Sequence, residues 1–379
     1  MANLFEDNLK LNAEEMDAGK TVLRSRPLKL ELTATTACNL SCIMCSRGQT
    51  NRSLSPESAE KLAALFPYLQ QLDIQGGEPL IAPWLDSFLE RAAAFPQLRK
   101  FITTNGLLID RKRAELFASS DISLIWSIDS PRPGVYEHIR RGARFEQLSA
   151  ALAAVKEANA RLGKNPRKEI NVVVMRSNAG HLEEFLPFAL EHGFPVINFV
   201  PILFNEKSPE DLFTNGTPEE ARQLAARIEA LRREAEKAGV RVQSSVPVPP
   251  PPQEPAPQQP ASSEAAPAEF EPQGKFRIVL PPGFVPNPFE TRAPGEPVLC
   301  RRPWQQLFVD FSREDGPDPQ NVFPECFCWH PLGNIETDTI EEIWNGAEMQ
   351  EYRRRLFSGN LSGYCRRVCL QRLSRERFT

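Results

Sequence analysis

Short apolar runs alternate with amphipathic segments from about residue 28 to residue 202. Each run is seven or eight residues long and rich in Leu, Ile, Val and Phe, which is typical of a buried β-strand. We therefore expect strands over residues 28–35, 69–75, 98–104, 122–128, 169–175 and 195–202.

Helical patterns occupy the segments between these expected strands. Ser55, Pro56 and Glu57 make a typical helix start, because serine caps free amide groups and proline fits the first turn. Strand–helix alternation repeated six times predicts an α/β fold, either a partial barrel or a doubly wound parallel sheet. Ligands of both architectures gather at the carboxyl ends of the strands. The expected helices include residues 55–66, 146–162 and 178–193, and a charged helix over 218–239 closes the series.

The composition changes sharply after the last of these helices. Sixteen prolines stand between residues 245 and 297, a density that favours polyproline II or disorder and forms no packed core. A second small module follows, with a strand expected over 303–311 and a helix over 337–359. We therefore expect four parts, which are an N-terminal extension (1–27), a barrel (28–240), a proline-rich linker or insertion (241–295) and a small α+β domain (296–379).

Charge and hydropathy argue against several classes of protein. The net charge of −4 gives no support for a nucleic-acid partner or for an anionic membrane surface. The N-terminus is polar and acidic, and no apolar run approaches the ~18 residues of a membrane span. We therefore expect a cytoplasmic protein. In that reducing environment, cysteines bind metal more often than they pair as disulfides.

The eight cysteines form two groups separated by 254 residues without one. Cys38, Cys42 and Cys45 follow the first expected strand in a C-x3-C-x2-C run, with no fourth ligand nearby. A structural zinc site takes four protein ligands, which this run supplies poorly unless a distant histidine completes it. An iron–sulfur cube held by three thiolates would keep one iron open for an external ligand.

This cysteine run, at the end of the first strand, resembles the signature of the radical S-adenosylmethionine (SAM) superfamily. The resemblance implies a partial (βα)6 TIM-type barrel and a [4Fe–4S] cluster held by Cys38, Cys42 and Cys45. It also implies that SAM chelates the open iron through its amino and carboxylate groups. An external one-electron donor of the flavodoxin or ferredoxin type would reduce the cluster, which would split SAM into methionine and a 5′-deoxyadenosyl radical.

Further motifs stand at the ends of the expected strands, where the resembled family has its SAM contacts. In "QGGEP" (75–79), the resemblance assigns Gly76, Gly77 and Glu78 to the SAM amino group, although the same residues suit a glycine turn before a helix. In "TTNG" (103–106), it places Asn105 beside the SAM molecule.

Four more residues receive SAM contacts by the same resemblance. Ser127 and Asp129 lie two positions apart, so they share one strand face, and they would hold the ribose. Either of them also suits a helix cap or a turn. Arg140 would meet the SAM carboxylate, although its neighbour Arg141 makes an exposed basic pair the alternative interpretation. Met44, which stands before the third cysteine, would lie against the adenine.

The second group of cysteines resembles the SPASM/Twitch extension, which holds auxiliary [4Fe–4S] clusters. Five cysteines follow residue 200, so one auxiliary [4Fe–4S] cluster with four ligands fits better than two clusters. Asn321 favours Cys326 over Cys328, because it stands where the extension has a glycine and asparagine tolerates a left-handed turn. A zinc site built from the same cysteines is the alternative. The expected ligands are Cys300, Cys326, Cys365 and Cys369, with Cys328 spare.

The sequence therefore predicts a radical SAM oxidoreductase or modifying enzyme. Its radical would abstract hydrogen from a substrate that the sequence leaves open, either a peptide or protein or a small molecule. No residue stands out as a catalytic acid or base. The alternative is an iron–sulfur electron-transfer or metal-binding protein without SAM turnover, against which Glu78, Ser127, Asp129 and Arg140 argue because such a protein needs no SAM pocket.

Overall fold

The computed structural model describes residues 3–45, 51–203, 205, 208–249, 300–311, 321–325, 328 and 330–358. Among them, one curved sheet runs through the molecule in the strand order β7-β6-β5-β4-β3-β2-β1-β8-β9. Neighbouring strands from β7 to β8 are parallel, and β9 is antiparallel to β8. The strands are β1 (Lys29–Thr35), β2 (Gln71–Gly76), β3 (Arg99–Thr104), β4 (Ile122–Ser127), β5 (Lys168–Val174), β6 (Val196–Pro201), β7 (Arg241–Ser244), β8 (Gln306–Val309) and β9 (Val322–Phe323).

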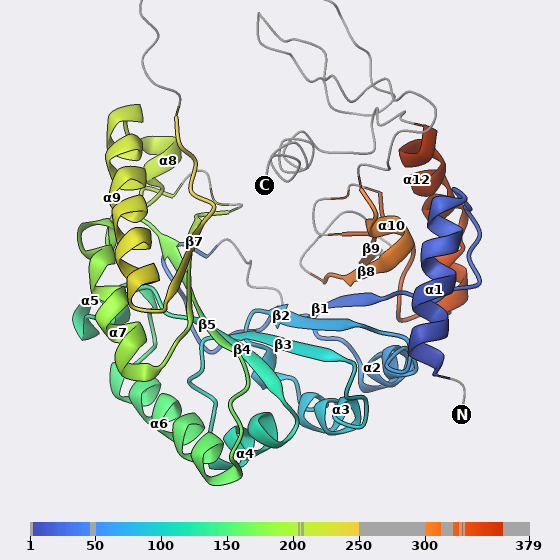
Figure 1. Ribbon diagram of the computed structural model, residues 1–379, viewed down its shortest axis with the longest axis horizontal. Coiled ribbons are helices and arrows are strands. Elements are labelled where there is room, and N and C mark those ends of the chain that lie inside the picture. The colour runs from blue at the N-terminus through green and yellow to red at the C-terminus, as the bar shows by residue number, and fades with distance from the viewer. Residues whose placement is uncertain are drawn as a thin grey trace, which may run out of the picture.

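Helices cover the outer, convex face of this sheet, and no described helix covers the inner face between the two arms (Figure 1). The arrangement is the expected α/β partial barrel, and each of the six expected strands is confirmed to within two residues. The longer helices are α1 (Leu4–Asp17), α2 (Pro56–Ala63), α3 (Leu85–Ala92), α4 (Arg111–Ser119), α5 (Pro133–Ile139), α6 (Phe145–Leu162), α7 (Phe185–His192), α9 (Pro218–Lys237) and α12 (Ala347–Ser358). Shorter ones are η1 (Pro79–Ile81), η2 (Ala179–Glu184), α8 (Leu212–Asn215), α10 (Arg302–Gln305) and α11 (Ile340–Trp344).

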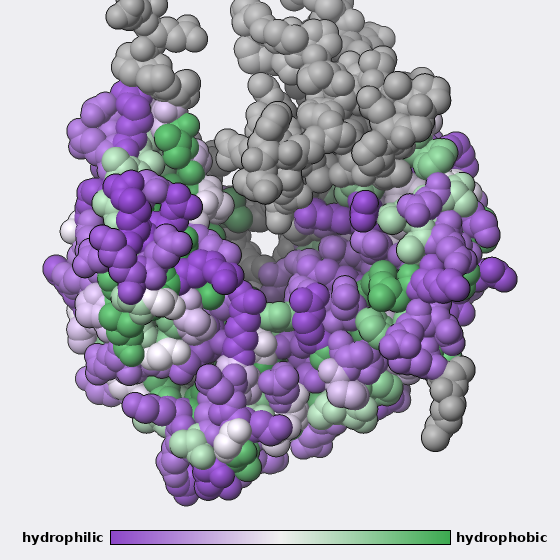
Figure 2. Space-filling model, viewed as in Figure 1, coloured by the Kyte–Doolittle hydropathy of each residue, from purple (hydrophilic) through white to green (hydrophobic). Residues whose placement is uncertain are grey.

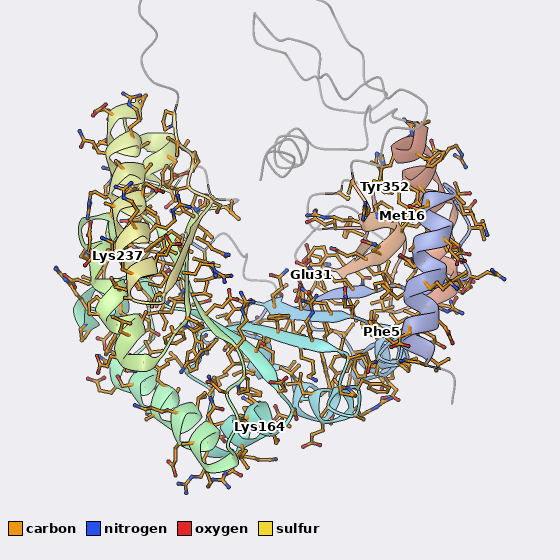
Figure 3. The ribbon with its side chains drawn as sticks, in the orientation of Figure 1. Phe5, Met16, Glu31, Lys164, Lys237 and Tyr352 are labelled. Carbon is orange, nitrogen blue, oxygen red and sulfur yellow. The ribbon has the colours of Figure 1, made fainter. Side chains whose placement is uncertain are left out.

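The strand faces explain this layering. In β1, Leu30, Leu32 and Ala34 are fully buried beneath the helices, whereas Glu31 between them points to the open side of the sheet, as Figure 3 shows. Alternation of apolar and polar side chains is how one face of a sheet is packed and the other is solvated. Figure 2 shows a mostly hydrophilic outer surface over α9 and a hollow between the two arms. No helix in the described part of the chain is long and apolar enough to cross a membrane.

The C-terminal module joins the barrel sheet instead of standing apart from it. Strand β8 pairs in parallel with β1, so the expected α+β domain extends the sheet beyond its first strand. Three expected boundaries need correction. Residues 241–244 were expected in the linker but form β7, the expected strand over 303–311 divides into α10 and β8, and the expected helix over 337–359 divides into α11 and α12. The last break falls at Gly346, where an added Cβ would lie 2.4 Å from the Glu342 carbonyl oxygen.

Candidate functional site

The loop that carries Cys38, Cys42 and Cys45 follows β1 at the carboxyl edge of the sheet. Its start is fixed by the Thr35 hydroxyl, which accepts a hydrogen bond from the Ala37 amide at 3.0 Å. Cys38 and Cys45 are exposed and Cys42 is half-buried, and all three are free thiols. The loop therefore carries three free thiol groups at the edge of the sheet where the predicted SAM contacts stand.

Gly76 and Gly77 let the end of β2 lie directly against the start of this loop. The Gly77 amide donates to the Thr35 carbonyl at 2.7 Å, and the Glu78 amide donates to the Ala37 carbonyl at 2.8 Å. A Cβ on Gly77 would lie 2.2 Å from the Ala37 carbonyl oxygen, far inside any real contact. The two glycines therefore have a packing role here. Their expected contact with the SAM amino group stays a prediction.

Glu78 connects the ends of β2 and β3. It is fully buried, and its carboxylate accepts hydrogen bonds from the Thr104 hydroxyl at 2.7 Å, the Asn105 amide at 2.8 Å and the Leu80 amide at 3.2 Å. Burial raises the pKa of this carboxyl, while the hydrogen bonds from Asn105, Thr104 and Leu80 act in the opposite direction. A buried carboxylate at this position favours the approach of a cationic group such as an ammonium.

Asn105 reaches from the end of β3 to the cysteine loop. Its side-chain amide donates to the Asn39 side-chain oxygen at 2.8 Å, and its own oxygen accepts from the Leu107 amide at 3.0 Å. Asn39 directly follows Cys38, so this contact links the first cysteine to the third strand. Asn39 could not be singled out from the sequence, because an exposed asparagine in a loop carries no distinctive signal.

Asp129 and Arg140 form a buried ion pair with 2.7 Å between Asp129 Oδ2 and Arg140 Nη2. Burial raises the pKa of the Asp129 carboxyl and Arg140 opposes that rise. Ser127, two residues earlier at the end of β4, is half-buried. The structure therefore brings two of the three charged residues of the predicted set into direct contact.

Met44 lies in a small apolar cluster beside the loop. Its buried neighbours in this cluster are Ile139, Met175 and Ile202, which come from the segments after β4, β5 and β6. An apolar patch of this kind suits the face of a planar aromatic ring. The four side chains of this cluster are buried, and the expected adenine contact of Met44 stays a prediction.

The donor set at the loop fits an iron–sulfur cluster. Three thiols stand on one short loop. Burial raises the pKa of Cys42 to about 11, and the charges of Cys45 and Cys38 act in the same direction. Nearby, the nitrogen Nε of the buried Arg140 donates to no acceptor among the described residues. Among the described residues, no three potential metal ligands lie close enough together to bind one metal ion. The loop therefore supplies three cysteines, but their sulfur atoms are not arranged as they would be around a metal.

The second group of cysteines is only partly described. Cys300 is buried just before α10 and Cys328 is half-buried after β9, whereas Cys326, Cys365 and Cys369 lie outside the described residues. The prediction of a left-handed turn at Asn321 is wrong, because Asp121 is the one residue besides glycine with a positive φ among those described. Asn321 instead donates to the Asn334 side-chain oxygen at 3.0 Å and accepts from the Ile335 amide at 2.9 Å.

Comparison with known families matches two stretches of the chain. Residues 32–189 match the radical SAM superfamily, and residues 300–370 match SPASM, an iron–sulfur cluster-binding domain. The radical SAM match implies a [4Fe–4S] cluster together with SAM, and the SPASM match implies auxiliary iron–sulfur binding.

Curated relatives share part of this sequence. GTP 3′,8-cyclase 1 of Pseudomonas aeruginosa is 28% identical over 219 residues, which is 55% of this chain and 65% of the relative. GTP 3′,8-cyclase of Geobacter sulfurreducens is 32% identical over 184 residues, covering 45% of this chain and 55% of the relative. The matched stretch is thus between about half and two thirds of the relatives' length.

Solved structures share the fold over most of the chain. SuiB of Streptococcus suis bound to S-adenosylmethionine has a TM-score of 0.58 at 15% identity, with 92% of this chain and 72% of that chain covered. The enzyme anSMEcpe with bound AdoMet has a TM-score of 0.58 at 18% identity, with 90% of each chain covered. At these identities the likeness describes the fold.

Proposed function

This chain belongs to the radical SAM superfamily and carries a C-terminal SPASM module, and from that premise we propose that it cleaves SAM reductively to remove a hydrogen atom from a substrate held on the open face of its sheet. The observation that carries the proposal is the convergence of Glu78, Asn105 and the Asp129–Arg140 pair around the cysteine loop. An electron-transfer protein would have no use for these buried polar groups.

Different residues would bind the cluster and the separate parts of SAM. Cys38, Cys42 and Cys45 would hold the [4Fe–4S] cluster, and Met44 would lie against the adenine. When bound, the cluster and SAM supply an electron and a 5′-deoxyadenosyl radical, and the protein contributes position and the exclusion of water. Arg140 would meet the SAM carboxylate through Nε, the buried donor that has no acceptor among the described residues. Cys300 would belong to one auxiliary [4Fe–4S] cluster.

The open face of the sheet indicates a substrate rich in hydrogen-bond donors, such as a peptide or a small molecule with amino or hydroxyl groups. Glu31 accepts from the Gln75 amide at 2.8 Å, and Asp73 and Glu31 share the Lys29 ammonium at 2.6 Å and 3.6 Å. Across the sheet, Glu169 adds a further carboxylate. The cations beside these carboxylates, Lys29 and Arg167, are already engaged in ion pairs with them, so neither is available to a triphosphate, and this face suits a nucleoside triphosphate poorly.

A reduction step requires a partner. We propose an external one-electron donor of the flavodoxin or ferredoxin type, because the described chain carries no other redox group beyond the two cysteine sets. No nucleic acid or membrane is part of the proposal.

Anaerobic reconstitution with iron, sulfide, SAM and dithionite tests the proposed cleavage. The expected product is 5′-deoxyadenosine. The triple variant Cys38→Ala, Cys42→Ala, Cys45→Ala is the control, and it should make none while retaining about four irons at the auxiliary site. Absence of 5′-deoxyadenosine from the fully loaded parent protein would instead support the iron–sulfur electron-transfer alternative, and zinc at the second site would refute the auxiliary cluster.

Addition of GTP tests the inferred substrate class. GTP should leave the thermal unfolding midpoint of the reconstituted protein unchanged, because Lys29 and Arg167 on the open face are already paired with carboxylates. A midpoint that rises with GTP concentration would show binding of a nucleoside triphosphate and would overturn the inference, whatever the outcome of the cleavage assay.

A further inference from the structure

The segment around Arg140 is fastened alongside the cysteine loop. The Ser41 amide donates to the Arg141 carbonyl at 2.9 Å, and the Ile43 amide donates to the Ile139 carbonyl at 3.0 Å. The two hydrogen bonds have antiparallel register, because the paired numbers rise on one side as they fall on the other. Cys42 therefore lies directly opposite Arg140.

Arg140 uses this position to contact two of the groups around it. Its Nη1 lies 4.0 Å from the Cys42 sulfur, and its Nη2 lies 2.7 Å from Asp129 Oδ2. The side chain is only 7% exposed, so its orientation depends on these neighbours and not on water. A further donor, Nε, is buried without an acceptor among the described residues, and an incoming anion would supply one.

Asp129 has contacts at both carboxylate oxygens, although Oδ2 has an ion pair and no hydrogen bond among the described residues. Oδ1 accepts a hydrogen bond from the Val173 amide at 2.8 Å, while Oδ2 faces Arg140. Its backbone carbonyl accepts from the Asn178 side chain at 2.9 Å, which fixes the residue further. The side chain is completely buried, so its charge is balanced by Arg140 and not by water.

Tyr136 lies near Arg140, Asp129 and Cys42 and was not singled out from the sequence. It is fully buried, and its hydroxyl has no hydrogen-bond partner among the described residues. Arg140, Asp129 and Cys42 are near enough for their charges to act on this hydroxyl, whose pKa is raised to about 12, mainly by burial. The Arg140 guanidinium is thus enclosed on several sides.

We propose that Asp129 is a positioning residue that holds Arg140 over Cys42 and toward the SAM carboxylate, and that it is not a ligand of the ribose. This inference rests on the proposed function, since it concerns how that function's SAM molecule is held. It replaces the ribose role that the sequence resemblance gave to Asp129, and it leaves Ser127, which is half-buried at the end of β4, as the candidate for the ribose.

The test compares SAM with decarboxylated SAM, which keeps the ribose and lacks the carboxylate. Binding is measured by equilibrium dialysis on the anaerobically reconstituted protein. Asp129→Asn and Arg140→Gln should each weaken SAM about tenfold, the worth of one charge-assisted hydrogen bond, and leave decarboxylated SAM unchanged. Ser127→Ala is the matched control and should weaken both ligands. If Asp129→Asn weakens both ligands equally, Asp129 binds the ribose and the proposal is wrong.

A double variant keeps the test decisive if Asp129→Asn does not fold, because that change leaves a buried guanidinium without its counter-charge. Asp129→Asn combined with Arg140→Gln removes both charges and should bind SAM as Arg140→Gln alone does. A further tenfold loss in the double variant would show that Asp129 acts independently of Arg140, which overturns the proposal. Failure of the parent protein to bind SAM would refute the proposed function itself.

Discussion

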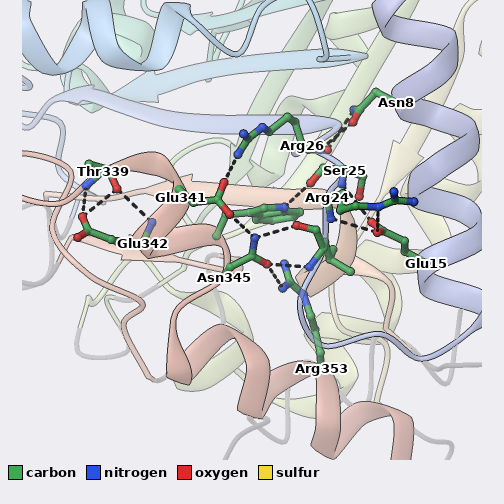
Figure 4. A network of polar contacts seen from close by, with 12 residues as sticks. Asn8, Glu15, Arg24, Ser25, Arg26, Thr339, Glu341, Glu342, Asn345 and Arg353 are labelled. Carbon is green, nitrogen blue, oxygen red and sulfur yellow. Dashed lines mark hydrogen bonds and ion pairs between the residues drawn. The ribbon is translucent and has the colours of Figure 1, made fainter.

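The Arg353 guanidinium stacks on the Trp344 ring, with its central carbon 4.5 Å from the ring centroid. Both side chains are completely buried. Arg353 donates to the Thr21 carbonyl at 2.6 Å, and the Trp344 indole donates to the Ser25 carbonyl at 2.7 Å. The pair therefore joins α11 and α12 to the N-terminal segment, in the network that Figure 4 shows. The expected N-terminal extension is thus a packed part of the C-terminal module.

Replacement of Arg353 should destabilise this module. Arg353→Ala leaves the half-buried Thr21 carbonyl and the buried Pro303 carbonyl without their donor, and Pro303 accepts from Arg353 Nε at 2.8 Å. We expect a loss of about 3 kcal/mol in the free energy of unfolding, because each unsatisfied buried group costs about 1–3 kcal/mol. Urea denaturation measures the loss.

The next residue along the helix provides the control for this change. Arg354 is exposed and pairs with Glu351 on the same helix. Arg354→Ala should change stability by less than about 0.5 kcal/mol, since such exposed pairs contribute little. Equal losses from the two variants would contradict a stabilising role for the buried Arg353 contacts.

The strands of the barrel could be predicted from the sequence because each is an apolar run between polar segments. Strand β7 could not, since Arg241–Ser244 has one buried side chain and gains its structure from pairing with β6. The N-terminal helix was missed for a related reason. It buries the polar side chains of Asn8, Asn12 and Glu15 against partners that are distant in sequence, so its apolar pattern is weak.

The residues of the candidate site could be recognised from the sequence, but their mutual contacts could not. Asp129 and Arg140 were each assigned to SAM by resemblance, and their pairing depends on the hydrogen bonds that set Arg140 opposite Cys42. Glu31 gave no chemical signal in an ordinary strand. Its significance comes from neighbours on β2 and β8, which only the sheet order supplies.

Substitution of Gly77 should displace the cysteine loop. In Gly77→Ala the new Cβ would meet the carbonyl oxygens of Ala37 and Thr36 at 2.2 Å and 2.5 Å, and these backbone atoms can move only with the loop. We expect loss of most of the iron bound by Cys38, Cys42 and Cys45, measured as iron per chain in a variant whose second cysteine set is intact. Gly134→Ala is the control, because a Cβ there meets nothing within 4 Å. Full iron loading in Gly77→Ala would contradict the packing role.

Glu31 should make stability fall as pH rises. Burial raises its pKa above the ordinary value of 4.5, Lys29 opposes the rise, and Asp73 adds to it. The folded protein therefore holds this proton more tightly than the unfolded chain does, and stability declines from pH 4.5 upward until the folded-state carboxyl has ionised. Glu31→Gln should raise the thermal unfolding midpoint at pH 7–8 and have little effect below pH 4.5. A midpoint lowered equally at every pH would contradict this.

The auxiliary ligand set can be tested on the two cysteines that the structure describes. Cys300 is buried next to α10, and Cys328 is half-buried after β9. We expect Cys300→Ala to lose most of the roughly four irons of the auxiliary cluster, because the change removes one of the four expected ligands and leaves one iron of that closed cluster unprotected. Cys328→Ala should retain them, since Cys326 fills the corresponding place in the expected set. Iron and sulfide analysis of each variant, made in the Cys38→Ala, Cys42→Ala, Cys45→Ala background, isolates this site. If Cys328→Ala loses iron and a Cys326→Ala variant retains it, Cys328 is a ligand and Cys326 is not.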